Sequence, residues 1–388
     1  MQPDEALASL RDGAAQIISE HELREKLRLG RPLRVKLGVD PTSSDIHLGH
    51  SIVLRKLREF QDLGHQAVLI IGDFTGMIGD PSGRSVARPH LSSEEVQANA
   101  ETYREQAFKV LDASRTEIVF NGDWFRQMRY EDVIRLNSRV TLQQMLQRED
   151  FSERLNKQHP IHAHEIQYPI MQGWDSVMVK ADVELGGTDQ LFNILVGRDF
   201  QREEGMAQQV VFLLPILEGV DGSKKMSKSL GNFIGVNESP AKMFGKLMSI
   251  SDELMARYYP MLLRRSLSPD VHPLQAKKEL AFEIVKTYHS SAEAEKTLDE
   301  WNIRFSEKRL GDTELPNFGK RQGETLNIVV AAYLEVFHLE KSRAEAGRLI
   351  KQGSVQLDGA KIVDPKTTID LKAGQSLRLD KTHAVRVQ

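Results

Sequence analysis

Residues 67–72, AVLIIG, constrain the fold more than any other segment of the chain. An apolar run of this length has the size of a β-strand, and its unbroken hydrophobicity is typical of a strand that is buried on both faces. Another strand is expected at residues 33–39, and residues 51–63 carry apolar side chains at helical spacing. Strand, helix and buried strand in this order open a doubly wound α/β domain with a parallel sheet. Residues 210–217, VVFLLPIL, repeat the buried-strand pattern, so this domain is expected to end near there.

A histidine motif stands between the first strand and the helix, in residues 41–50, PTSSDIHLGH. His47 and His50 are three residues apart, so a helix that begins here places both imidazoles on its N-terminal face. Backbone N–H groups and the helix dipole favour phosphate at that end. Gly49 removes a side chain at the point where a nucleotide must approach closely. The motif alone could be an ordinary helix start.

A lysine motif follows about 175 residues later, in residues 225–229, KMSKS. It lies in the polar, glycine-punctuated stretch 219–232, which is typical of a mobile loop that carries two ammonium groups to a polyphosphate. Either motif alone is a weak signal. Together, in this order and at this spacing, they predict the two halves of an ATP site and resemble the class I aminoacyl-tRNA synthetases.

Composition restricts the alternatives. A chain of 388 residues exceeds the usual size of a single domain, so two or three domains are expected. The absence of cysteine excludes disulfides, thiolate zinc sites and a cysteine nucleophile. No segment reaches the 18 or so apolar residues that a membrane span needs, and the N-terminus has no secretory pattern, so a cytoplasmic protein is expected. The net charge of −3 means that any nucleic-acid contact must come from a local patch.

Such a patch is expected near the C-terminus. Arg343, Arg348 and Lys351 share a predicted helix that leads through Gly353 into a hairpin. From Lys341 onward ten Lys or Arg residues stand against five Asp or Glu, which is an RNA-binding footprint. A solvated helix face could show the same excess. The sequence SRAEAGRLIKQGSVQLDG, however, closely resembles that of a small RNA-binding module first named for a ribosomal small-subunit protein.

Three further clusters lie between the two phosphate motifs. Residues 79–83, GDPSG, follow the buried strand and contain Asp80. Tyr168, Gln172 and Asp175 recur at helical spacing, so they form one polar stripe on a helix, which suits a small polar ligand better than a core. Residues 186–190, GGTDQ, offer close backbone approach together with a carboxylate and an amide.

With these clusters the resemblance becomes specific. YPxxQxxD, GGxDQ, HLGH, KMSKS and the C-terminal module, in their order, are similar to the bacterial tyrosyl-tRNA synthetase family over essentially the whole chain. The resemblance implies a Rossmann-like catalytic domain at residues 1–235, a small helical domain at 236–304, a linker at 305–324 and an α+β RNA-binding domain at 325–388. It also implies a homodimer, for which the stretch 130–145 could form the contact.

The resemblance further implies a role for each motif residue. Tyr168, Gln172 and Asp80 are expected to bind the ammonium group of tyrosine, Asp175 its phenolic hydroxyl, and Gln190 to orient it. The residues expected to bind ATP or to act on its phosphates are Asp40, Thr42, His47, Gly49, His50, Gly187, Asp189, Lys225, Ser227 and Lys228. The reaction forms tyrosyl-adenylate and pyrophosphate from tyrosine and ATP, and then transfers tyrosine to the terminal adenosine of tRNA-Tyr.

Magnesium is expected to arrive on the phosphates of ATP, since the sequence shows no carboxylate cage for a protein-held metal. His162 and His164 are two residues apart, which places them on opposite faces of a helix, and no companion ligands are evident. A loop near the amino-acid pocket is therefore the preferred reading of residues 159–165.

One departure from the family pattern concerns the phenol. Many bacterial tyrosine enzymes carry a Tyr two residues before the glycine of the first strand, as a second partner for the hydroxyl. Here this position is Lys36, in VKLGVDPT, and the sequence does not reveal a substitute.

Two other functions remain open at this point. A related synthetase for tryptophan would share the architecture, although Asp175 and the C-terminal module argue against it. An RNA-binding protein that derives from a synthetase and has lost its catalytic activity should carry substitutions in HLGH or KMSKS, and both motifs are intact.

Overall fold

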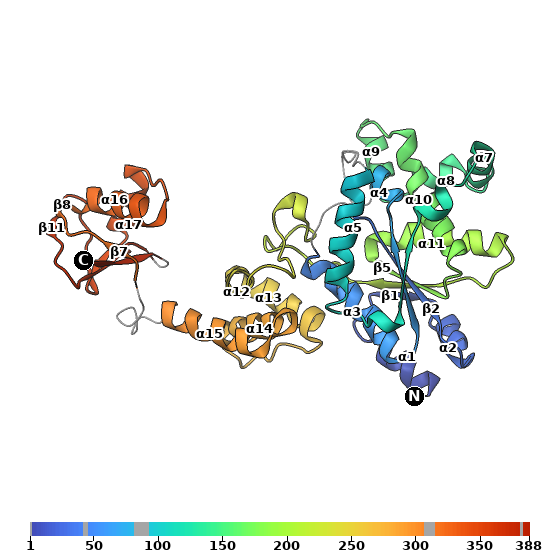
Figure 1. Ribbon diagram of the computed structural model, residues 1–388, viewed down its shortest axis with the longest axis horizontal. Helices are drawn as coiled ribbons and strands as arrows, with labels where there is room; N and C mark the ends of the chain where they lie inside the picture. Colours follow the sequence, from blue (N-terminus) through green and yellow to red (C-terminus); the bar gives the residue numbers. More distant parts are fainter. Residues whose placement is uncertain (1, 42–45, 81–92, 306–314, 381–382) are drawn as a thin grey trace. The chain divides into compact units, whose positions relative to one another are not determined.

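The computed structural model describes residues 2–41, 46–80, 93–305, 315–380 and 383–388. The chain forms two compact units, Met1–Ser291 and Ala292–Gln388 (Figure 1).

A six-stranded sheet is the centre of the first unit. Its strand order is β1-β6-β5-β2-β3-β4, and every pair is parallel except β1 with β6. The expected doubly wound parallel sheet is therefore confirmed, with one antiparallel strand at its edge. The strand expected at 210–217 ends at Leu214, because Pro215 has no N–H for the ladder. The strands are β1 Gln16–Ile18, β2 Arg34–Val39, β3 Gln66–Ile71, β4 Thr116–Phe120, β5 Val183–Gly187 and β6 Val210–Leu214.

The strand order reverses between β5 and β2. From β2 the chain moves outward to β3 and β4, whereas from β5 it moves the other way to β6. Because such crossovers are right-handed, α3 Leu48–Asp62 and α11 Leu191–Glu203 cover opposite faces of the sheet (Figure 1). A ligand crevice is expected beyond the carboxyl ends of the strands at this point.

Helices make up the rest of this unit. They are α1 Pro3–Arg11, α2 Glu20–Arg28, α4 Thr75–Ile78, α5 Ser93–Ala107, α6 Gly122–Phe125, α7 Tyr130–Asn137, α8 Leu142–Leu146, α9 Glu149–Asn156, α10 Ala163–Met178, α12 Pro240–Ser249, α13 Asp252–Tyr258 and α14 Pro273–Tyr288. A π-helical turn covers Tyr259–Leu263. The expected helical character of the chain after the lysine motif is thus confirmed. No helix among the described residues is long and apolar enough to cross a membrane.

The second unit begins with α15 Ser291–Phe305 and continues as an α+β fold, as expected. Helices α16 Thr325–Phe337 and α17 Arg343–Lys351 pack through Val329, Tyr333 and Ile350. One sheet has the order β10-β9-β12-β13-β7, and β8 pairs with β11. The strands are β7 Asn317–Phe318, β8 Gln322–Glu324, β9 Gln356–Leu357, β10 Ala360–Lys361, β11 Thr368–Asp370, β12 Ser376–Arg378 and β13 Ala384–Val387.

Two of these strands fall in the range expected as a linker. β7 pairs with β13, and β8 pairs with β11. Phe318 is only 3% exposed and belongs to the core of the unit. One apolar residue among polar neighbours has no periodicity, so local sequence could not reveal these pairings.

Candidate functional site

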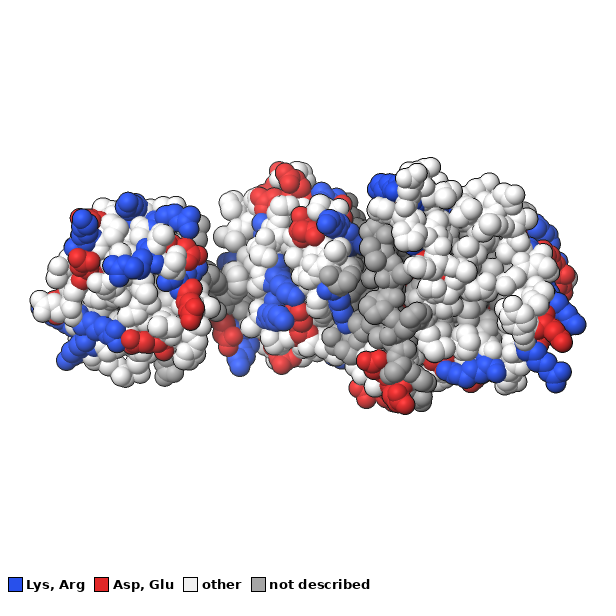
Figure 2. Space-filling view, turned by 90° about the horizontal axis from the view of Figure 1, so that it is seen from above, with Lys and Arg blue, Asp and Glu red and all other residues white. Residues whose placement is uncertain are grey.

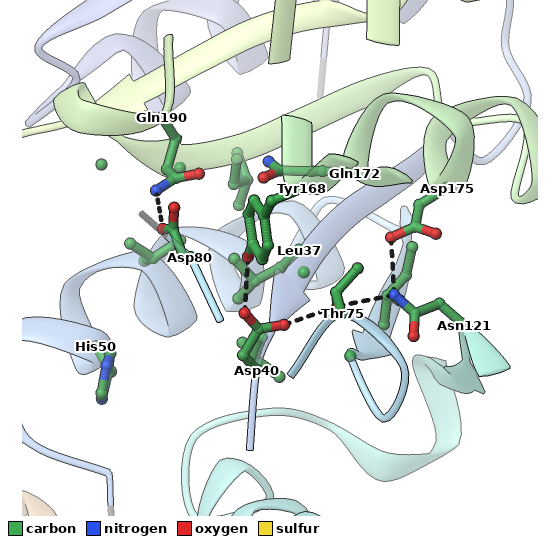
Figure 3. A pocket seen from close by; sticks show the side chains of 18 of the residues that line it. Leu37, Asp40, His50, Thr75, Asp80, Asn121, Tyr168, Gln172, Asp175 and Gln190 are labelled. Atoms are coloured by element: carbon green, nitrogen blue, oxygen red, sulfur yellow. Dashed lines mark hydrogen bonds between the residues drawn. The ribbon is translucent and has the colours of Figure 1, made fainter. Parts of the chain in front are cut away.

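A pocket of about 230 Å³ lies beyond the carboxyl ends of the parallel strands, where the strand order reverses (Figure 3). Segments far apart in sequence line it: the end of β2, the turn after β3, the residue after β4, the end of β5 and one face of α10. The sequence-predicted residues that line this pocket are Asp40, His50, Asp80, Tyr168, Gln172, Asp175, Gly187 and Gln190. Thr42 lies outside the described residues.

Asp175 is a buried carboxylate in the wall of the pocket, with 3% of its surface exposed. Its oxygens accept hydrogen bonds from Asn121 Nδ2 at 3.2 Å and from Trp124 Nε1 at 3.0 Å. Burial raises the pKa of Asp175 to about 7, although the charge of Lys36 and these two hydrogen bonds oppose the rise. The side chain therefore changes charge near neutral pH.

Asp40 and Tyr168 face each other across the pocket (Figure 3). The Tyr168 hydroxyl donates to Asp40 Oδ2, and the Thr75 hydroxyl donates to Asp40 Oδ1, both at 2.8 Å. Gly72 makes room for this carboxylate, since a Cβ there would lie 2.1 Å from Asp40 Oδ1. The carboxylate of Asp40 is consequently held in one orientation.

Asp80 lies on another side of the pocket. Gln190 Nε2 donates to Asp80 Oδ2 at 2.9 Å, and Arg148 Nη2 lies 3.3 Å from Asp80 Oδ1. Arg148 is 4% exposed and also pairs with Asp150 at 2.8 Å. This part of the pocket is therefore a network of opposite charges and amides.

The histidine motif begins α3, as expected, although the helix starts three residues before the predicted position. His47 is the N-cap, and its ring stacks on that of His50 with centroids 3.8 Å apart. Burial, together with nearby His50 and Lys228, lowers the pKa of His47 to about 2. Among the described residues, the buried Nδ1 of His47 has no hydrogen-bond partner, and a Cβ at Gly49 would lie 3.0 Å from the ring. The His47 imidazole is therefore uncharged at neutral pH and packs closely against the start of the helix.

The lysine motif lies beside the histidine motif. The backbone N–H of Leu48 donates to the carbonyl of Ile234 at 2.9 Å, and His47 forms a β-bridge with Gly235. Met226 approaches Gly49, because its Cβ lies 3.7 Å from the position of an added side chain there. The predicted juxtaposition of the two motifs is therefore present.

Two residues of the lysine motif are already held by neighbours. Lys225 Nζ lies 3.1 Å from Asp189 Oδ2, so the lysine motif touches the GGTDQ segment. The backbone N–H of Ser227 donates to Asn232 Oδ1 at 2.8 Å. Lys228 begins a short 3₁₀ turn, with its Nζ 6.0 Å from the centre of the Phe233 ring.

Sequence reasoning missed Thr75, Asn121, Trp124 and Arg148. Asn121 follows β4 directly, so the rule that ligands lie beyond strand ends could have found it, and Trp124 one turn later. Arg148 had no such signal, because it reaches Asp80 only through the tertiary fold. Among the described residues, no group of three or more His, Asp or Glu side chains could hold a metal ion.

In the second unit Arg343, Arg348 and Lys351 are all exposed on α17. Figure 2 shows several Lys and Arg side chains on the visible face of this unit, with Asp and Glu side chains among them. Arg343 Nη1 donates to Asn327 Oδ1 at 2.7 Å, which joins α17 to α16.

Comparisons with known proteins agree with this geometry. Residues 28–317 match the family described as tRNA synthetases class I (W and Y). The chain is 50% identical over 399 residues to the tyrosine–tRNA ligase of Oleidesulfovibrio alaskensis, covering 100% of this chain and 99% of that protein. It is 45% identical over 394 residues to the tyrosine–tRNA ligase of Aquifex aeolicus, with coverage of 100% and 99%. The chain belongs to the tyrosyl-tRNA synthetase family. Its activity is that of an ATP-dependent tyrosine–tRNA ligase. The two alternatives from the sequence, a tryptophan enzyme and an inactive RNA-binding relative of a synthetase, are therefore wrong.

Solved structures bear out the fold. A truncated mitochondrial tyrosyl-tRNA synthetase of Aspergillus nidulans superimposes with a TM-score of 0.62 at 21% identity, over 78% of this chain and 93% of that one. The tyrosyl-tRNA synthetase of Archaeoglobus fulgidus, solved with L-tyrosine, gives a TM-score of 0.61 at 22% identity, over 76% and 99%.

With the role that the sequence predicts for Asp175 at the phenolic hydroxyl, its pKa determines how amino-acid selection should depend on pH. An aspartate normally ionises near pH 3.8, whereas Asp175 keeps its proton up to about pH 7. Since the carboxylate is the stronger acceptor for a phenolic hydroxyl, kcat/KM for tyrosine relative to phenylalanine should rise about tenfold between pH 6 and 8. Both amino acids are measured with the same ATP, so a titration that affects only ATP binding cancels in the ratio. Asp175→Asn is the control and should give a flat ratio; an equally steep profile in that variant would contradict the prediction.

Proposed function

We propose that this pocket activates tyrosine. The tyrosine carboxylate attacks the α-phosphorus of ATP in line, which forms tyrosyl-adenylate and releases pyrophosphate. A terminal ribose hydroxyl of tRNA-Tyr then attacks the tyrosyl carbonyl, which releases AMP. The observation that carries this proposal is a buried carboxylate, Asp175, in the same pocket as His50 of the phosphate motif. No side chain acts as a nucleophile, so catalysis consists of positioning and of stabilising charge at the phosphate.

Different parts of the pocket would hold the two ends of tyrosine. Tyr168, Gln172 and Asp80 bind the ammonium group through oxygen acceptors, while Gln190 orients the substrate. Asp175 accepts the phenolic hydroxyl, with Asn121 and Trp124 fixing its oxygens. A site built for a hydroxyl leaves polar groups unpaired when phenylalanine binds; tyrosyl-tRNA synthetases are the standard example, with a discrimination of about 10⁵.

The two phosphate motifs would hold ATP. Thr42, His47 and His50 grip the triphosphate from one side, and Lys225 and Lys228 from the other, as negative charge develops. Asp40, Gly49, Gly187, Asp189 and Ser227 complete the nucleotide site. The contact between Lys225 and Asp189 supports this assignment. When ATP binds, a ribose hydroxyl can donate to Asp189 in place of Lys225, and a phosphate oxygen can accept from Lys225 in place of Asp189. Magnesium would arrive on the ATP phosphates and neutralise part of their charge.

Each domain of the chain would have its own function. Residues 1–235 form the catalytic domain, 236–304 the helical domain on the anticodon side, 305–324 the connection and 325–388 the RNA-binding domain. The exposed cations of α17 support the last assignment, since phosphate contacts dominate RNA affinity. We infer a cytoplasmic location, where both ATP and tRNA are available.

The enzyme would act as a homodimer. Large apolar side chains are exposed on α7 and α8: Tyr130 is 79% exposed, Ile134 53% and Leu142 57%. Clusters of exposed large apolar residues are typical of protein interfaces. They fall in the stretch 130–145 that the sequence suggested for the contact.

Exchange of labelled pyrophosphate into ATP, without tRNA, tests the proposed activation step. We expect exchange with tyrosine and none above background with tryptophan or phenylalanine. Asp175→Ala should lose tyrosine selectivity by at least a hundredfold, because the buried acceptor of the hydroxyl is gone. Exchange that tryptophan supports equally well would sink the assignment of Asp175.

Replacing the motif lysines tests their role. Lys225→Ala and Lys228→Ala should each lower the rate of tyrosyl-adenylate formation by about 10²-fold or more, while ATP binding weakens far less. The two effects separate in single-turnover measurements at varied ATP. Lys224→Ala is the matched control, since this neighbouring exposed lysine has no proposed role; an equal loss there would point to a general defect of the loop.

Charge reversal on α17 tests the RNA face. Arg343→Glu with Arg348→Glu should lower tRNA charging at least tenfold and leave pyrophosphate exchange unchanged, because these residues would contact phosphates of the tRNA. Arg343→Lys with Arg348→Lys is the control and should charge tRNA close to normally, because it keeps both positive charges at the same positions. Equal loss of charging and exchange would mean that α17 has a structural role.

A further inference from the structure

Lys36 and Glu184 form a fully buried ion pair behind the amino-acid pocket. Their side chains are 0% and 1% exposed, and Lys36 Nζ lies 2.9 Å from Glu184 Oε1. They are direct neighbours on adjacent parallel strands, because Lys36 of β2 is in register with Glu184 of β5. The pair therefore joins the two strands between which the strand order reverses. Neither residue lines the pocket, so neither can touch a substrate there.

Both members of the pair hold α10, the helix that lines the pocket. Lys36 Nζ donates to the carbonyl of Gln172 at 2.9 Å and to Ser176 Oγ at 2.7 Å. Glu184 Oε1 accepts from Gln172 Nε2 at 3.1 Å, and its Oε2 accepts from Ser176 Oγ at 2.9 Å. The pair thus contacts both the backbone and the side chain of Gln172, which Figure 3 shows beside Tyr168.

These contacts determine which way the Gln172 amide points. A carboxylate can only accept hydrogen bonds, so Glu184 requires the NH₂ group of Gln172 to face it. Gln172 Oε1 accepts from Asn193 Nδ2 at 2.9 Å. The Asn193 amide is oriented in turn, because its Oδ1 accepts from Arg148 Nη1 at 3.1 Å and a guanidinium can only donate.

The chain of amides therefore has a fixed polarity. It runs from a group that only donates, Arg148, to a group that only accepts, Glu184. A flip of Gln172 would turn its NH₂ toward that of Asn193 and its oxygen toward the Glu184 carboxylate, so two hydrogen bonds would become two repulsive contacts. Lys36 supplies the charge that allows the carboxylate to be buried.

We infer that the buried Lys36–Glu184 pair is a positioning element for amino-acid binding, which fixes the polarity of the Gln172 amide so that its oxygen faces the substrate ammonium group. This inference rests on the proposed role of Gln172 in tyrosine binding. Stability alone does not account for the pair, since apolar side chains of similar volume can replace a buried ion pair without loss. An apolar pair would remove one of the two contacts that fix the Gln172 amide and leave only the contact with Asn193.

The test uses two inhibitors that resemble tyrosine and differ from each other only in the ammonium group. Tyramine and 4-ethylphenol share the phenol and both lack the carboxylate, so the ratio of their inhibition constants in tyrosine-dependent exchange isolates ammonium recognition. Glu184→Gln lowers the cost of turning the Gln172 amide, because the new side chain can both donate and accept, so that only Asn193 still selects one orientation. We expect the preference for tyramine over 4-ethylphenol to fall about tenfold or more. Any effect of the altered charge on Asp175 acts on the phenol that both compounds share and therefore cancels in the ratio.

A second variant and a control address folding. Lys36→Met combined with Glu184→Gln avoids an unpaired buried lysine and should show the same loss of preference. Lys56→Met removes another fully buried lysine, which contacts Glu59 and the carbonyls of Leu10 and Asp12 away from the pocket. It should leave the preference unchanged, because a general loss of stability weakens both inhibitors equally.

Gln172→Ala separates this inference from the function on which it rests. If Gln172→Ala abolishes the preference for tyramine and both Glu184 variants retain it, the pair has no positioning role and the proposed pocket stands. If Gln172→Ala also retains the preference, Gln172 does not bind the ammonium group, and both statements are overturned. Loss in Gln172→Ala and in both Glu184 variants, with Lys56→Met unchanged, supports the inference.

Discussion

The reversal of strand order between β5 and β2 is the constraint on which the rest of the structure depends. Because the crossovers from the two strands leave in opposite directions, a crevice forms beyond the strand ends at this point. Residues at the carboxyl ends of neighbouring strands then come together, although they are far apart in sequence. The histidine motif follows β2 and the GGTDQ segment ends β5, so both segments border the same crevice.

The crevice is expensive to build, since it buries charged groups. Asp175, Lys36 and Glu184 all have exposures of 3% or less, and each would destabilise the fold without partners. Hydrogen bonds from Asn121 and Trp124 limit the cost at Asp175, although its pKa still rises to about 7. The same partners restrict how the pocket side chains can move, so the groups that make the burial tolerable also keep the site in one geometry.

Local patterns were reliable where one segment carried the whole signal. The buried strand at 67–72, the helix after HLGH, the polar stripe of α10 and the helical stretch after KMSKS were all predicted and are all present. The family and its activity followed from the motifs, since five of them occur in one order, and the comparisons confirm both. The strands near Phe318 were not predicted, because a single buried residue in a polar segment gives no periodic pattern. The individual roles of the site residues remain predictions.

The sequence by itself determined the fold class, the histidine and lysine motifs, the polar stripe of α10 and the family, because each depends on residues that are close together or on motifs that can be recognised singly. Only the tertiary structure decided what the unusual Lys36 does. Its partner Glu184 is 148 positions away, and the pairing arises from the register of two parallel strands. The contact of Arg148 with Asp80 also joins segments that are far apart in the sequence. The sequence shows only that a carboxylate and a cation are present. The fold determines which of them are buried together, and burial strengthens the electrostatic interaction of the pair with the groups around it.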